Sequence, residues 1–184
     1  LVHLPLVASA AIVPLVGHPL LYLPIHVVWL ELMIHPSAML AFQSATPSTP
    51  LHRRADRGAG RIFDRADVVR IAITGALVTG LVVWGYLRSL GIGREVDHAR
   101  AMAIAVLTLT SAGIVCALSG LRSRSARWIV LLTLLASVLG IQLRPLATRL
   151  HLHPLHGDDW LLAAAASLVA TGLVVALRTR RTRH

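Results

Sequence analysis

The chain has little charge and a single cysteine, and each shortage excludes a class of protein. Only 14% of its 184 residues are charged, whereas 55% are hydrophobic; a typical soluble domain has about 25% charged residues. The mean hydropathy of +0.70 and the grouping of apolar residues into blocks exclude a soluble globular domain and indicate several membrane spans. Cys116 stands alone, which excludes an internal disulfide and a cysteine-based metal site.

Lysine is absent, so all eighteen basic residues are arginines, and the net charge is +10. Such a charge would suit nucleic acid, but the arginines lie at the ends of apolar stretches and form no basic face with interleaved aromatic residues. We therefore expect no nucleic-acid partner. Ser/His/Asp, Cys/His and glycine-rich phosphate-binding arrangements are also absent from the sequence. Arginine without lysine, with abundant Ala, Leu and Val, is typical of a GC-rich bacterial genome.

Six apolar stretches approach the length of about 20 residues that a bilayer core requires of a helix. We expect an all-α protein, a multi-span membrane helical bundle that forms one domain over 1–184. The predicted transmembrane helices are 1–16, 20–42, 68–87, 101–118, 128–143 and 160–177. The first is apolar from its first residue and has no basic, cleavable leader. We expect it to be truncated and interpret the chain as a fragment or the product of a truncated gene.

The arginines are divided unequally between the two ends of these helices. Thirteen lie on the side of loop 43–67 and the C-terminus, and five lie on the other side. The positive-inside rule predicts that the side with more arginines is cytoplasmic. Loop 43–67 and the C-terminus are therefore predicted to be cytoplasmic.

Glu31 lies near the middle of the second apolar stretch, where a charged residue costs roughly 2.5–3.5 kcal/mol. His35 follows at i+4 on the same helix face, and we expect His3 of the preceding helix to reach the same region. Pro36 has no N–H and is predicted to break the helix and free the carbonyl of Leu32. The pattern predicts cation binding or a proton relay. The alternative is a protonated Glu31 that hydrogen-bonds His35 and only holds helices together.

A second group of ligand-type side chains lies just before the last predicted helix. Its members are His151, His153, His156, Asp158 and Asp159. A surface metal site is one interpretation, but we favour a solvated loop that caps the helix, because acidic residues suit a helix N-terminus.

The stretch GHPLLYLPIHVVWLELMIHPSAMLAF resembles the C-terminal membrane region of P-type cation-transporting ATPases. That family carries P-x-x-x-x-W-x-N-L-x-T-D at the opening of its sixth membrane helix, and Pro24, Trp29 and Leu32 match this motif. HARAMAIAVLTL is similar to the opening of the family's eighth helix, and DDWLLAAAASLVATGLVVALRTR to its final helix. The resemblance implies membrane helices five to ten of such a pump.

The resemblance also implies where ion ligands would lie, and the residue types differ from those of the family. The family's ligand positions in helices five, six and eight fall on His3, Leu6, Glu31, Ile34, His35 and Ser111. A calcium site built from hard oxygen ligands is not expected from this set. Glu31 with one or two histidines instead indicates a proton or a softer divalent metal, or an inactive relative.

The catalytic motifs of these pumps, D-K-T-G-T, T-G-E and G-D-G-x-N-D, do not occur in the sequence. We expect the chain alone to be no enzyme and to hold no cofactor; Mg-ATP would be used by the missing N-terminal pump domains. The implied function is the ion pathway of a cation pump in a bacterial plasma membrane, with the lipid bilayer and the transported cation as further partners. An orphan membrane module with a binding or regulatory role and a subunit of a secondary transporter remain as alternatives.

Overall fold

The computed structural model describes residues 3–43, 65–119 and 124–179, and the regular elements within these ranges are all α-helices. They are α1 (His3–Leu15), α2 (Pro24–Gln43), α4 (Arg65–Gly91), α5 (Val96–Ser119), α6 (Arg124–Gln142), α7 (Arg144–Arg149) and α8 (Gly157–Thr179). The prediction of an all-helical membrane bundle is confirmed. Segments of α4, α5 and α8 are long and apolar enough to cross a bilayer, whereas the apolar segments found in α1, α2 and α6 are shorter.

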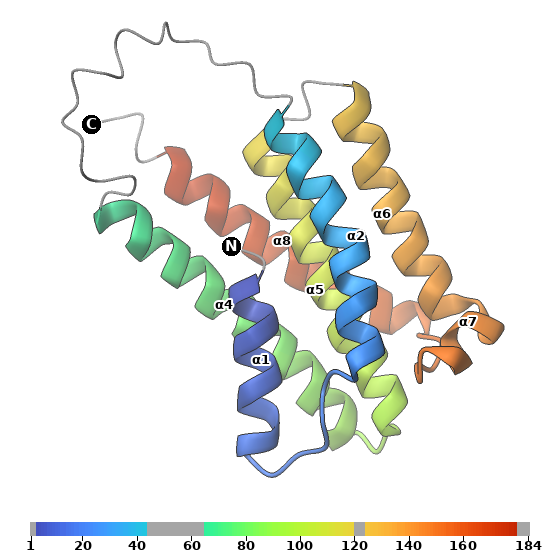
Figure 1. Cartoon of the computed structure of the whole chain (residues 1–184). Helices are drawn as coiled ribbons and strands as arrows, with labels where there is room; N and C mark the ends of the chain where they lie inside the picture. Colours follow the sequence, from blue (N-terminus) through green and yellow to red (C-terminus); the bar gives the residue numbers. More distant parts are fainter. Residues whose placement is uncertain (1–2, 44–64, 120–123, 180–184) are drawn as a thin grey trace, which may run out of the picture.

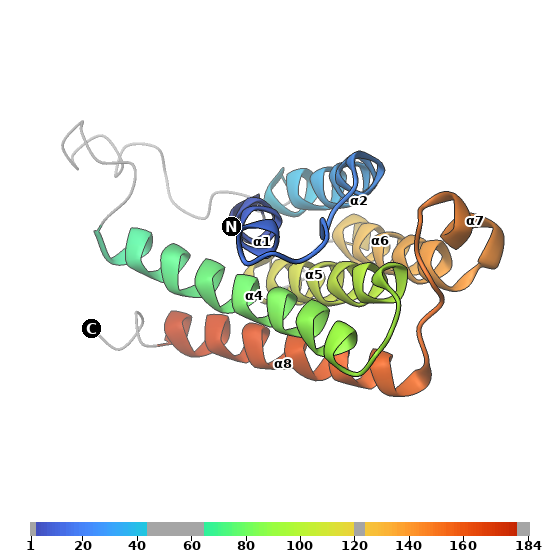
Figure 2. The ribbon, with the colours of Figure 1, turned by 90° about the horizontal axis from the view of Figure 1, so that it is seen from below.

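The helices surround α5, which contacts α2, α4, α6 and α8. Figure 2 shows α1 and α2 on one side of the bundle and α4 and α8 on the other, with α5 between them. The sequence of α5 suits this place, because residues 101–107 are apolar throughout and at most 2% exposed. A helix that is apolar all round is a buried one, and its alanines allow neighbouring helices to approach closely.

Successive long helices run in alternate directions through the bundle. In Figure 1, α2, α5 and α8 end toward the upper side, where α4 and α6 begin. The helix ends that flank loop 43–67 therefore lie on the same side as the end of α8, as the arginine distribution requires.

The connection between α1 and α2 is longer than the sequence predicts. Helix α1 ends in a Schellman motif, in which Gly17 has a φ of 81° and its N–H donates to the Pro14 carbonyl over 3.0 Å. The N–H of His18 completes the motif by donating to the Val13 carbonyl over 3.2 Å. Helix α2 begins only at Pro24, because a proline fits the first turn of a helix, where no N–H is needed.

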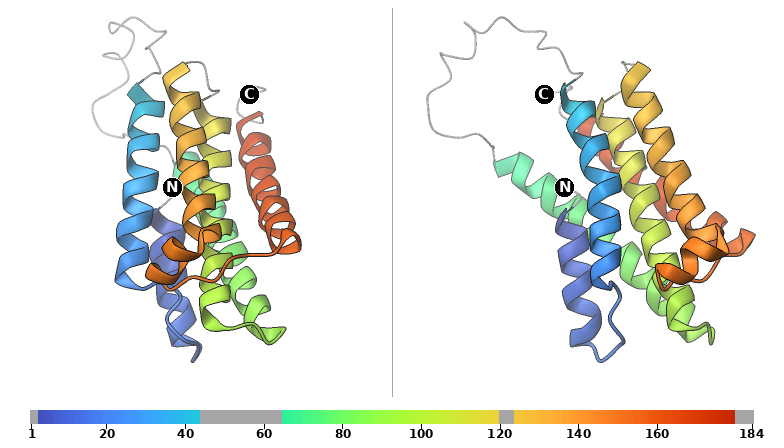
Figure 3. Two further views of the ribbon diagram at one scale, coloured as in Figure 1. Left: turned by 90° about the vertical axis from the view of Figure 1, so that its right-hand side faces the viewer. Right: turned by 45° about the vertical axis from the view of Figure 1, so that its right-hand side comes forward.

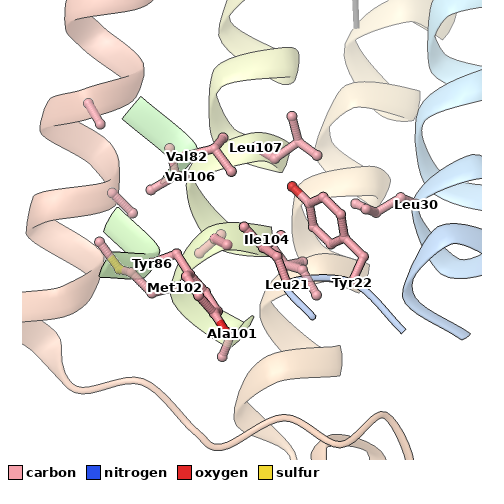
Figure 4. Close-up of a cluster of buried hydrophobic side chains, with 14 of the residues drawn as sticks. Leu21, Tyr22, Leu30, Val82, Tyr86, Ala101, Met102, Ile104, Val106 and Leu107 are labelled. Carbon is pink, nitrogen blue, oxygen red and sulfur yellow. The ribbon is translucent and has the colours of Figure 1, made fainter. Parts of the chain in front are cut away.

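The residues before Pro24 pack into the bundle instead of extending α2. Leu21 and Tyr22 reach the cluster of buried side chains around Ile104 in Figure 4. The hydroxyl of the fully buried Tyr86 donates to the Pro19 carbonyl over 2.9 Å, which ties this connection to α4.

A short helix, α7, occupies part of the segment that the sequence predicts to be a loop after 128–143. Pro145 lies in its first turn, where proline is tolerated. The α7 C-terminus is joined to the start of α2 by His26, whose Nδ1 accepts the Leu23 N–H over 3.1 Å. The other ring nitrogen of His26, Nε2, therefore donates to the Leu150 carbonyl.

Helix α6 lies close to α2 at Gly140, and this contact gives a testable prediction. A Cβ atom on Gly140 would lie 2.9 Å from Cζ2 of Trp29, a rigid ring that cannot yield as a flexible side chain would. We expect Gly140→Ala to lower the free energy of unfolding by about 1–3 kcal/mol. Thermal unfolding of the detergent-solubilised chain measures the change.

Gly80→Ala is the matched control for this variant. A Cβ atom at Gly80 in α4 meets nothing within 4 Å, so alanine should leave stability unchanged or raise it by up to about 1 kcal/mol through its helix propensity. Equal melting temperatures for the two variants would contradict the close approach of α2 and α6.

Candidate functional site

The structure brings Glu31 and His3 together between α1 and α2. His3 is the first residue of α1, and its Nε2 lies 3.2 Å from Oε1 of Glu31. Their side chains are 57% and 36% exposed, respectively. Helix α1 packs extensively against α4, while α2 packs against α5 and α6, so this contact joins two helices that otherwise have different principal neighbours.

The backbone of α2 on either side of Glu31 is held against α6. Thr133 of α6 donates its hydroxyl to the Met33 carbonyl over 3.2 Å. Two residues before Glu31, the Trp29 ring packs over Gly140 of α6. These contacts fix the part of α2 that carries the carboxylate and leave its side chain directed to α1.

A carboxylate and an imidazole on two apolar helices have two chemical uses. A carboxylate oxygen and a neutral imidazole nitrogen can both bind a cation, and the same two groups can pass a proton between them. Either use requires that the helices stay close enough for the 3.2 Å contact to form.

The structure describes the other residues predicted for this site to different extents. His35 and Pro36 belong to α2, but their side chains lie outside the described residues. The backbone is helical on both sides of Pro36, so α2 is not interrupted where the sequence predicts a break. A proline within a membrane helix can be tolerated when neighbouring groups satisfy the freed carbonyl. Ser111 is buried within α5.

An apolar groove between α1 and α4 is a poorer candidate for an ion. Its volume is about 860 Å³, and its walls include Leu4, Ala76 and Trp84. Among the described residues that line it, Arg88 is the only charged one, and its guanidinium carbon lies 6.0 Å from the centre of the Trp84 ring. Such walls offer almost no oxygen or nitrogen ligands for a cation.

A second polar cluster, which the sequence predicts only in part, lies where α5 and α8 begin. His98 of α5 is buried, and its Nε2 lies 3.0 Å from Oδ2 of Asp159 in α8. Asp159 also accepts the N–H of His156 over 3.1 Å, so it caps the start of α8 as predicted. Its side chain is buried, however, and not solvated as the sequence predicts. His98 is missed by sequence reasoning because it lies 61 residues before Asp159; the only local signal is a histidine in the first turn of an apolar helix.

Two comparisons with known proteins bear on the identity of the chain. The model of the family described as "Cation transporting ATPase, C-terminus" matches residues 19–180. The matched range contains Glu31, His98 and Asp159, while His3 precedes it. A comparison with curated proteins finds no match. Because the family match covers most of the sequence, the chain belongs to the C-terminal family of cation-transporting ATPases and is an integral membrane protein, the transmembrane part of a P-type pump.

Proposed function

We propose that the chain forms the ion pathway of a P-type cation pump and that Glu31 and His3 are ligands or proton carriers along it. The observation that carries the proposal is the 3.2 Å contact between His3 Nε2 and Glu31 Oε1 across two apolar helices. An ionisable residue within a membrane helix is costly and usually serves transport. His35, one helical turn after Glu31, is proposed as a further member from its i+4 spacing.

The exposure of the pair supports a role for further parts of the pump. More than a third of each side chain is exposed in the described bundle. Exposure to lipid would be unfavourable for both groups, because hydrocarbon offers no hydrogen bonds. We propose that membrane helices of the N-terminal pump region cover this side of α1 and α2 and complete the ion site.

The chemistry of the pair restricts the cation. A calcium site requires six to eight oxygen ligands, whereas one carboxylate and one or two imidazoles suit a proton or a borderline divalent metal such as Zn²⁺. We therefore propose a proton or a divalent transition metal as the transported ion.

The energy for transport would come from domains outside this chain. The sequence contains no phosphorylation or nucleotide-binding motif, so we propose that the chain itself does not hydrolyse ATP and that N-terminal cytoplasmic domains use Mg-ATP. The arginine distribution supports a cytoplasmic C-terminus, and the composition supports a bacterial plasma membrane.

The coding DNA upstream of Leu1 tests this proposal against an orphan membrane module. A pump requires an open reading frame that continues upstream through a D-K-T-G-T phosphorylation motif. An in-frame stop codon close to Leu1 would contradict the pump and favour the orphan module.

A further inference from the structure

The polar cluster at the start of α5 and α8 contains more ligand atoms than a capped helix needs. His98, His156 and Asp159 each offer one ligand atom, and these atoms all lie within 4.8 Å of one another. The left view of Figure 3 shows how the connection after α7 crosses the lower side of the bundle to reach α8. That path delivers His156 and Asp159 to His98, which belongs to a different helix.

Two of the three separations are close to those around a tetrahedral metal ion. His98 Nε2 and His156 Nδ1 lie 3.0 Å and 3.5 Å from Oδ2 of Asp159. Zinc bonds of about 2.0–2.2 Å place neighbouring ligand atoms about 3.3–3.5 Å apart. The His156 side chain is 53% exposed, so it has room to move toward His98.

We propose that His98, His156 and Asp159 form a binding site for a divalent transition metal ion of the Zn²⁺ class. Two imidazole nitrogens and one carboxylate oxygen are the donors that this class prefers over Mg²⁺ or Ca²⁺. Three protein ligands leave one of the four tetrahedral positions to water or to another side chain.

Ser89 gives the buried histidine the second contact that metal-binding histidines require. Its Oγ lies 2.8 Å from Nδ1 of His98, so Nε2 is the ring nitrogen directed to Asp159. When Nε2 binds a metal, Nδ1 carries the proton and donates it to Ser89, and this orients the ring. A hydroxyl can both donate and accept, so the same contact persists without the metal, when Nδ1 accepts.

His153 is a further imidazole beside the site. The centre of its ring is 6.0 Å from that of His98. Its Nδ1 donates to the Pro154 carbonyl over 3.0 Å, which leaves Nε2 with a lone pair for a metal. Its backbone N–H donates to the Asp97 carbonyl over 3.3 Å and anchors it next to α5.

The site joins elements that the transport proposal does not use. It links the first turns of α5 and α8, whereas Glu31 and His3 belong to α2 and α1. A bound metal would fasten the segment before α8 to α5. The inference therefore stands independently of whether the chain transports ions.

Calorimetric titration with ZnCl₂ tests the site. The purified full chain is first treated with a chelator and freed of any histidine tag. Wild-type chain is expected to bind one zinc ion tightly at this site, apart from any held by Glu31 and His3, and to melt at a higher temperature when loaded. His156→Ala removes an exposed ligand with little risk to folding and should weaken this binding at least about tenfold. Ser89→Ala should weaken it by about 10- to 100-fold, as expected for an outer contact.

His151→Ala is the matched control, because His151 is an exposed histidine of the same connection and no ligand atom of the site comes from it. Its zinc affinity should equal that of wild type. Co²⁺ in place of zinc should give the intense visible absorption of a four-coordinate site in wild type and lose it in His156→Ala. Equal zinc binding by wild type and His156→Ala, or no binding by wild type, would show that the cluster only holds hydrogen bonds and would overturn the proposal.

Discussion

Glu31→Gln is expected to abolish cation-stimulated ATP hydrolysis by the complete pump. Glutamine keeps the size of the side chain but removes its charge and its capacity to carry a proton. Loss of one charged partner from such a site costs roughly 2–4 kcal/mol, which corresponds to about 30- to 1000-fold weaker cation affinity. The measurement is the rate of ATP hydrolysis across a series of pH values and divalent metal concentrations.

The chain offers a matched control, since its only other glutamate is Glu95. Glu95 is exposed in the connection between α4 and α5, and Glu95→Gln should leave cation dependence unchanged. His3→Ala removes the partner 3.2 Å from Glu31 and should weaken cation stimulation by a smaller factor than Glu31→Gln. An unchanged cation dependence in Glu31→Gln would remove Glu31 from the ion pathway.

Asp159→Ala is expected to cause a large loss of stability, greater than that of replacing its neighbour Asp158. The carboxylate is 5% exposed and contacts His98, which is 3% exposed. Removing one member of a buried pair leaves the other without its partner and costs about 3–5 kcal/mol. The uncapped N–H of His156 adds to the loss.

Asp158→Ala tests whether this loss arises from burial rather than from acidity at the start of α8. Both aspartates lie in the first turn of α8, but Asp158 is exposed. Its replacement should cost less than about 1 kcal/mol, the usual contribution of a charge to the helix dipole. Thermal unfolding with a chelator present compares the two variants without metal, and similar melting temperatures would argue against the buried pair.

The sequence predicts the helices well because the length of each apolar stretch determines where a membrane helix can form. Each of the six apolar stretches contains most of a helix, and residues 101–107 of α5 are buried as their uniformly apolar sequence requires. The ends of the helices are less predictable. Tyr22 counts as part of an apolar stretch, yet it lies before α2 and packs against Ser9 of α1, where the two hydroxyls are 3.3 Å apart.

The candidate ion site is predictable in part, because ionisable residues are rare in the apolar stretches. Glu31 stands out because it is a carboxylate in an apolar helix, and His3 because it opens the preceding one. The cluster around His98 is not predictable, because a histidine at a helix start carries no signal of its partners. Only the fold brings Ser89, Asp159 and His156 to it.

Cation movement across the membrane of sealed vesicles that contain the complete protein tests the central claim most directly. We predict movement of protons or of a divalent transition metal that requires Mg-ATP and disappears in vesicles carrying Glu31→Gln. Cation movement without ATP, or ATP-driven movement that persists unchanged in Glu31→Gln, would contradict the account.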